Sequence, residues 1–237
     1  MEWLTPQRYA VELETETARF AAAATRRDED QKIEKCPEWT VRDLVTHVGT
    51  GHRLAAGIIV ERRDHPAEYK LLDAPDDKND WAAWLTAGAQ RLNAAVADHG
   101  FDGEVWTWQP KFQTAGFWQR RMLHDLIIHR FDADPGGDLA PDLAADGIAD
   151  LLLAFEYFQK LTGNGETVLF TATDTGQSWH VTLTPAGPEW ITEARPADAI
   201  CKAPVKDLLL ILNRRRDPIL IEGDATIYDR WWENSQF

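Results

Sequence analysis

The amino-acid sequence predicts an α+β fold, with a four-helix bundle in the first part of the chain and a small α/β domain after it. Two observations carry this prediction. Through residues 1–163, apolar residues recur at the three- and four-residue spacing of amphipathic helices. After Gly165, short stretches alternate apolar with polar residues between Gly or Pro turns, which is typical of strands. We therefore expect one domain over residues 1–163 and a second over residues 164–237.

The helices of the first domain have recognisable start signals. Thr5 supplies a hydroxyl cap, and Pro6 fits the first helical position. Thr40, followed three residues later by Asp43, is an acidic variant of the capping box and predicts the start of a second helix. Three further helices are expected over residues 81–98, 117–131 and 142–163, with a charged connector over 28–35 and a loop over 65–80. Several long helices with short and long links indicate a bundle.

The second domain combines strands with one helix. Strands are expected over residues 167–173, 178–184, 189–193 and 218–221. Residues 204–214 predict a helix, because Leu208 to Leu212 form an unbroken apolar run. The C-terminal part of the chain is therefore expected to be a small α+β domain.

The net charge disfavours one class of partner. The chain has 237 residues and a formal charge of −14. Nucleic-acid binding needs a basic face, because its affinity comes largely from phosphate contacts and counterion release. The dense basic run Arg214-Arg215-Arg216 is too short to offset the overall charge. We expect no nucleic-acid partner.

Cysteine usage and hydropathy indicate the compartment. Cys36 and Cys201 lie far apart and form no CxxC pair, which fits a reducing environment. The N-terminus has no basic segment followed by an apolar one, and no stretch approaches the about 20 apolar residues that span a bilayer. We expect a cytoplasmic protein without a membrane partner.

The helix expected over residues 117–131 carries polar groups on an apolar face. Residues three and four apart share a helix face, so Trp118, Met122, Asp125 and His129 form one stripe. Burying an unpaired carboxylate costs several kcal/mol, so Asp125 needs a cation or strong hydrogen bonds. A divalent metal such as zinc suits a carboxylate and an imidazole. A simple ion pair between Asp125 and His129 explains the same pattern.

His47 is a third candidate ligand, from another helix. It shares a face with Leu44, Gly51 and Leu54, so it is expected to point inward. A lone inward histidine is more often a hydrogen-bonded core residue, but His47, Asp125 and His129 together supply three protein ligands. Three ligands leave a position for water or substrate, as in catalytic zinc sites.

The remaining histidines are weaker candidates. His124 lies roughly 100° around the helix from Asp125, and His52, His65 and His99 are expected at helix edges or in loops. Asp132 can orient the free ring nitrogen of His129 or serve as a solvated helix-end residue. The sequence has no H-E-x-x-H, P-loop or G-x-S-x-G motif, which disfavours the metalloproteases, nucleotide hydrolases and α/β-hydrolases that carry them.

Three segments carry a family resemblance: the run Cys36-Pro37-Glu38-Trp39-Thr40-Val41-Arg42-Asp43-Leu44-Val45-Thr46-His47, the helix from Trp118 to Ala133, and the run from Asp207 to Asp224. Together they resemble the mycothiol-dependent maleylpyruvate isomerase family. The resemblance implies a DinB-like four-helix bundle followed by a small sterol-carrier-like domain.

The same resemblance implies a site. A zinc ion held by His, Glu and His carries over to His47, Asp125 and His129, with aspartate where the family usually has glutamate. An arginine of the second domain carries over to Arg214. We expect a zinc-dependent or other divalent-metal-dependent isomerase or S-transferase, with mycothiol as cosubstrate and a small electrophile as substrate. The alternatives are a metal- or small-molecule-binding regulatory protein on the same bundle, and a bundle that binds no metal.

Overall fold

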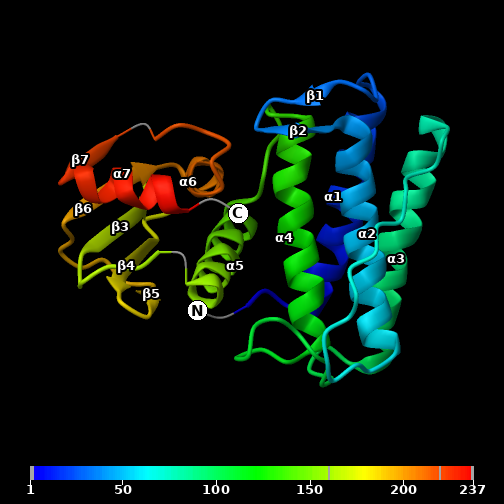
Figure 1. The fold of residues 1–237 in the computed structure, drawn as a ribbon, viewed down its shortest axis with the longest axis horizontal. Helices are drawn as coiled ribbons and strands as arrows, with labels where there is room; N and C mark the ends of the chain where they lie inside the picture. Colours follow the sequence, from blue (N-terminus) through cyan, green and yellow to red (C-terminus); the bar gives the residue numbers. More distant parts are fainter. Residues whose placement is uncertain (1–2, 160, 219, 236–237) are drawn as a thin grey trace. The chain divides into compact units, whose positions relative to one another are not determined.

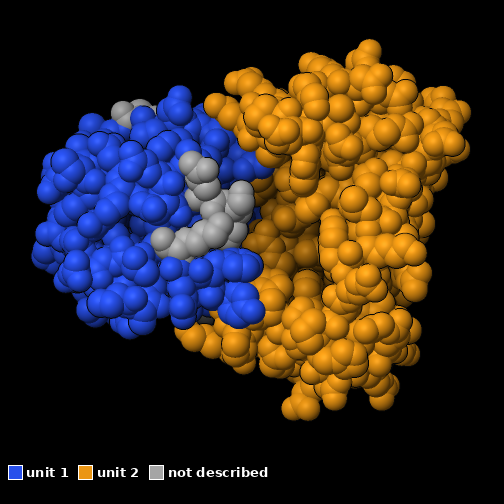
Figure 2. Space-filling model, viewed as in Figure 1, with its two compact units in different colours: residues 1–3, 138–237 blue, residues 4–137 orange. Residues whose placement is uncertain are grey.

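The computed structural model describes residues 3–159, 161–218 and 220–235. The chain divides into two compact units, residues 4–137 and residues 138–237 with the first residues of the chain (Figure 2). The change from helical to strand-like sequence falls near residue 163, but the division between units lies at Gly137. The helix after Gly137 therefore groups with the sheet, and a domain boundary at 163/164 stays a prediction.

The first unit is a bundle of four long helices (Figure 1). They are α1 (Pro6–Thr25), α2 (Val41–Val60), α3 (Trp81–His99) and α4 (Ala115–Ala133). Helices α1 and α2 each pack against both α3 and α4. The expected start signals are confirmed: Thr5 caps α1, and the backbone N–H and hydroxyl of Thr40 exchange hydrogen bonds with Asp43 at the start of α2. The bundle core is apolar along α1 and α2, with Phe20 and Leu44 fully buried.

A short hairpin precedes α2 where a charged connector was expected. Strand β1 (Lys32–Ile33) pairs antiparallel with β2 (Cys36–Thr40), which leads directly into α2. The charged residues of this segment hid the pairing in the sequence. The apolar side chain of Ile33 is buried, and its removal from water stabilises the hairpin. The hairpin positions Trp39 immediately before the helix that carries His47.

The second unit combines one five-stranded sheet with three helices. The sheet order is β5-β4-β3-β6-β7, formed by β3 (Thr167–Ala172), β4 (Ser178–Thr184), β5 (Gly187–Ile191), β6 (Ala199–Ala203) and β7 (Ile221–Gly223). Strands β3 and β6 are parallel and the other neighbours antiparallel. The helices are α5 (Pro141–Phe158), α6 (Val205–Leu212) and α7 (Ala225–Asn234). Helices α6 and α7 pack on the sheet, and α5 packs against α6 and β5.

The expected α+β class, a helical bundle followed by a small α/β domain, is confirmed, but two element boundaries were wrong and two elements were missed. Helix α5 ends at Phe158, before the expected Gly163, because Gln159 adopts a left-handed conformation at φ 49°. Strand β6 and helix α7 were not expected: alanine is a poor strand former, and the cap signal of Asp224 went unread. The strand expected over residues 218–221 begins only at Ile221, and Ile219 lies outside the described residues.

Among the described residues, no helix is long and apolar enough to cross a bilayer.

Candidate metal centre

His47, Asp125 and His129 converge at one point between α2 and α4. His47 Nε2 lies 3.1 Å from Asp125 Oδ2, and His129 Nε2 lies 3.8 Å from the same oxygen. One ligand atom from each of the three side chains lies within 4.8 Å of the others. The structure therefore brings the three predicted ligands together, and their binding of a metal stays a prediction.

Local sequence explains the convergence. Asp125 and His129 are one turn apart on α4, so their side chains project from the same face. On α2, Gly51 lies one turn after His47, and a Cβ atom there would come within 3.1 Å of Met122 Sδ on α4. The missing side chain lets α2 and α4 approach closely, because a larger residue would displace Met122.

Asp132 fixes the orientation of His129. Its Oδ2 accepts a hydrogen bond from His129 Nδ1 at 3.0 Å, and its side chain is fully buried. Because Nδ1 faces Asp132, Nε2 is the ring nitrogen that faces Asp125. A carboxylate behind a histidine is typical of metal ligands, because it sets both the tautomer and the ring orientation. The thiol of Cys36 lies 3.9 Å from the same carboxylate oxygen.

Two neighbouring side chains complete the surroundings. The Trp39 ring lies 4.7 Å from the His47 ring and 5.6 Å from the His129 ring, centroid to centroid. Arg121 Nη2 lies 3.4 Å from Asp125 Oδ1. Sequence analysis did not predict Trp39 as a residue of the site. Its position immediately before Thr40, the cap of the helix that carries His47, was the signal that could have identified it. The site is open on one side, since the His47 and Asp125 side chains keep 28% and 27% of their exposure.

His47 and Asp125 each favour the charged form of the other. Burial lowers the pKa of His47, but the negative charge of Asp125 and its hydrogen bond outweigh burial and raise that pKa overall. Burial raises the pKa of Asp125, yet the charges of His47 and His129 hold it well below its usual range. The aspartate is therefore ionised at neutral pH. A metal ion that replaces the ring protons would find one carboxylate oxygen and two imidazole nitrogens as donors, with Arg121 on the other carboxylate oxygen.

These residues fit a divalent metal. Zinc binds imidazole nitrogen and carboxylate oxygen at about 2.0–2.1 Å, so two donors on one tetrahedral ion lie about 3.4 Å apart. The two distances from Asp125, 3.1 and 3.8 Å, bracket that separation. Asp125 also bonds His47 directly. The metal-free alternative is therefore a cluster of His47, Asp125 and His129 across α2 and α4, and not a pair within α4.

The expectation for His52 was wrong. It lies within α2, is 1% exposed, and burial lowers its pKa to about 4. Within the described part of the chain, neither of its ring nitrogens has a hydrogen-bond partner. His65 and His99 lie at exposed or half-buried positions, bonded to Asp64 and to the Glu104 carbonyl, respectively. His124 is buried in α4.

Arg214 lies in the second unit, just after α6, with φ of 62°. Its guanidinium stacks over the Trp232 ring at 4.5 Å and donates a hydrogen bond to the Trp232 carbonyl oxygen. A catalytic role for Arg214 stays a prediction.

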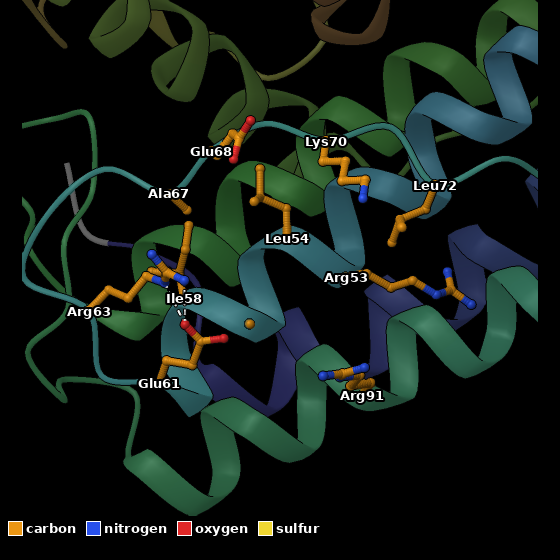
Figure 3. Close-up of a pocket in the computed structure, with 11 residues that line it drawn as sticks. Arg53, Leu54, Ile58, Glu61, Arg63, Ala67, Glu68, Lys70, Leu72 and Arg91 are labelled. Carbon is orange, nitrogen blue, oxygen red and sulfur yellow. Dashed lines mark hydrogen bonds and ion pairs between the residues drawn. The ribbon is translucent and has the colours of Figure 1, made fainter.

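A groove of about 490 Å³ lies beside α2 in the first unit. One wall is helix α2, with Leu54 and Ile58, and another is the loop after it, with Lys70 and Leu72 (Figure 3). We call residues 66–74 of this loop the strap. None of the three candidate ligands lines the groove, so the metal centre and the groove are separate features of the same helix.

The fold and the site define a two-part α+β protein whose helical bundle carries a His/Asp/His cluster. Residues 10–134 match the model of the mycothiol maleylpyruvate isomerase N-terminal domain. This match spans more than half of the chain, and the chain belongs to that family.

Solved structures agree on the fold. Two crystal structures of the mycothiol-dependent maleylpyruvate isomerase superpose on the chain. One has a TM-score of 0.60 at 16% identity, and the other, a histidine-to-alanine mutant, has 0.63 at 15%. Each alignment covers 93% of this chain and 95% of the other. At this identity, the likeness shows a shared fold. A comparison with curated protein sequences finds no match.

Proposed function

We propose that the protein is a metal-dependent isomerase or S-transferase that uses a low-molecular-weight thiol, mycothiol, to act on a small electrophile of the maleylpyruvate type. One observation carries the proposal: His47, Asp125 and His129 converge on a partly open site, with Asp132 behind His129. Family membership supports the choice of thiol and electrophile.

His47, Asp125 and His129 would hold zinc or another divalent metal. When bound, such an ion favours the thiolate form of a thiol at neutral pH, and the thiolate is the reactive nucleophile. Asp125 contributes a carboxylate that stays ionised, because the neighbouring imidazoles hold its pKa low. Asp132 keeps His129 in the tautomer that leaves Nε2 free. The Trp39 ring contacts both imidazoles and would help to hold their orientation.

The proposed reaction is a reversible addition. The thiolate sulfur bonds to a carbon of the activated double bond, and the π electron pair moves onto the conjugated carbonyl oxygen. Rotation about the resulting single bond and reversal of the addition give the isomer and return the thiolate. In an S-transfer, the sulfur instead displaces a leaving group. We propose Arg214 as the group that binds a substrate carboxylate, because a guanidinium pairs with it in bidentate geometry.

The test is turnover of maleylpyruvate by metal-loaded protein, with and without mycothiol. We expect turnover only with both metal and thiol, and a loss of at least about 100-fold in His47→Ala, since a metal ligand is removed. His65→Ala is the matched control, because His65 is exposed and its side chain bonds the neighbouring Asp64. Undiminished turnover without metal, or by His47→Ala, rejects the proposal. Metal binding without thiol-dependent turnover points to the regulatory alternative.

A further inference from the structure

The groove beside α2 has an open, apolar floor. Leu54 and Ile58 line it from the helix, and Leu72 lines it from the strap. Gly57 also lines it, and within the described part of the chain a Cβ atom there would meet nothing within 4 Å beyond its own helix backbone and its chain neighbours. The volume of about 490 Å³ lies within the range of about 300–1,000 Å³ that is typical of small-molecule sites. The floor therefore has room for an apolar group of a ligand.

Two hydrogen bonds hold the strap beside the helix. The backbone N–H of Leu72 donates to Thr50 Oγ1 at 3.0 Å, and that of Ala74 donates to Thr46 Oγ1 at 3.1 Å. Thr46 and Thr50 lie one turn apart on α2, so the strap is attached at two successive turns. The wall of the groove that carries Leu72 is therefore an anchored segment.

The groove has an excess of positive charge, although the whole chain has a formal charge of −14. Its charged lining residues are four cations and two carboxylates: Arg53, Arg63, Lys70, Arg91, Glu61 and Glu68. Arg63 Nε donates to Glu61 Oε2 at 2.6 Å, so these two charges offset each other. Arg53, Lys70 and Arg91 form no ion pair with any described residue. Cations without carboxylate partners attract anions to this part of the surface.

Arg53 is held in place by partners that carry no net charge. Its Nη1 donates to the Gly49 carbonyl oxygen at 3.0 Å and its Nη2 to the Trp84 carbonyl oxygen at 2.7 Å. The guanidinium also lies over the Trp84 ring, 4.1 Å from its centroid. Burial and then the positive charge of Arg91 lower the pKa of Arg53. A bound anion would offset the repulsion between the two guanidinium groups.

The charged and apolar parts of the groove follow one another along α2. Arg53 and Glu61 are eight residues apart, which corresponds to about 12 Å along the helix axis. Figure 3 shows Arg53 and Arg91 toward one end of the groove and Glu61 toward the other. Leu54 and Ile58 lie between these ends. A ligand along the groove would therefore meet positive charge at one end and apolar side chains beyond it.

We propose that the groove binds a small amphipathic anion, an alkyl carboxylate whose carboxylate pairs with Arg53 and Arg91 and whose chain covers Leu54, Gly57 and Ile58. A guanidinium binds a carboxylate in bidentate geometry, and the alkyl chain leaves water on contact with the floor. The site is separate from the candidate metal centre and does not depend on the proposed function.

Calorimetric titration with decanoate tests the proposal. Metal-free wild-type protein and His47→Ala are compared, so that binding of the carboxylate at the candidate metal centre is recognised. We expect the same Kd in both proteins, at least about 10-fold lower than the Kd of acetate or of decanol, because acetate lacks the chain and decanol lacks the charge. Decanoate that binds no tighter than acetate or decanol, or that loses its affinity in His47→Ala, overturns the proposal.

Two variants place the ligand in the groove. Gly57→Leu puts a side chain into the open floor, and α2 tolerates it because leucine forms helices better than glycine. We expect the Kd of decanoate to rise at least about 10-fold in Gly57→Leu and about 10-fold in Arg91→Gln, which removes one cation. Arg26→Gln is the matched control, because Arg26 is exposed and outside the groove, and its Kd should stay within about twofold of wild type. A wild-type Kd in folded Gly57→Leu or in Arg91→Gln overturns the proposal.

Discussion

The helical bundle and the sheet region place their ionic groups differently. In the bundle, Glu16 and Arg130 form an ion pair with side chains 0% and 3% exposed, which joins α1 to α4. In the sheet region, Lys202 and Glu222 pair at 2.8 Å across β6 and β7 with side chains 35% and 45% exposed. Charges inside the bundle are costly unless they are paired. The bundle accommodates such a pair in its interior, whereas the sheet and α7 bury apolar groups such as Trp179 and Trp231 and the Lys202–Glu222 pair stays exposed.

The largest expected effect is on the buried ion pair. Glu16→Ala removes the carboxylate that pairs with the buried Arg130 side chain, and we expect the free energy of unfolding to fall by about 3–5 kcal/mol. Glu16 also accepts a hydrogen bond from Arg19 at 2.7 Å, which the variant removes as well. Denaturant unfolding measures the change. A loss below about 1 kcal/mol would show that the interior pair behaves like a surface pair.

The next effect concerns His52, which lies on the same helix as His47 but has the opposite pKa shift. Burial lowers its pKa to about 4, with Arg53 and His47 adding to the shift and Asp125 opposing it. The unfolded chain takes up the proton near the usual value of 6.5. Above pH 6.5, His52 is neutral in both the folded and the unfolded state, and it does not reduce the free energy of unfolding. As the pH falls from 6.5 toward 4, the unfolded chain takes up the proton first, so the free energy of unfolding decreases by about 3 kcal/mol in all.

His52→Leu should flatten this part of the stability profile. Unfolding free energies of wild type and variant are measured between pH 7 and 4. We expect the variant to lose less stability on acidification, because leucine takes up no proton. Parallel profiles would show that His52 is hydrated or bonded in the folded protein.

A smaller effect is expected behind the candidate centre. Asp132→Asn weakens the hold on His129 Nδ1, and such outer groups contribute about 10- to 100-fold to metal affinity. Competition with a chelator of known affinity measures the change. Asp134→Asn is the control, with the same chemical change two residues further along. Equal affinities for both variants would mean that Asp132 serves the end of the helix and not the metal.

The smallest effect is expected in the sheet region. Glu222→Gln removes the exposed partner of Lys202 and should change the free energy of unfolding by only about 0–1 kcal/mol, less at high salt. The measurement is the same denaturant unfolding as for Glu16→Ala. A loss comparable with that of Glu16→Ala would remove the contrast between the two regions.

Sequence patterns captured the bundle better than the sheet. The caps at Thr5 and Thr40 and the stripe on α4 are local signals, so α1, α2 and the ligand set could be predicted. Strand β6 depends on its neighbours β3 and β7, and that pairing is not local. The position of the strap could not be predicted for the same reason, because Leu72 and Ala74 bond Thr50 and Thr46, which lie 22 and 28 residues away in sequence.

The central claim is that His47, Asp125 and His129 bind one metal ion. Elemental analysis of the protein after loading with zinc and removal of excess tests it most directly, alongside His47→Ala and His65→Ala. We predict about one ion per chain in wild type and His65→Ala, and loss of the ion in His47→Ala, because a three-ligand site loses one ligand. Wild-type protein without metal, or His47→Ala with a full complement, would contradict the account.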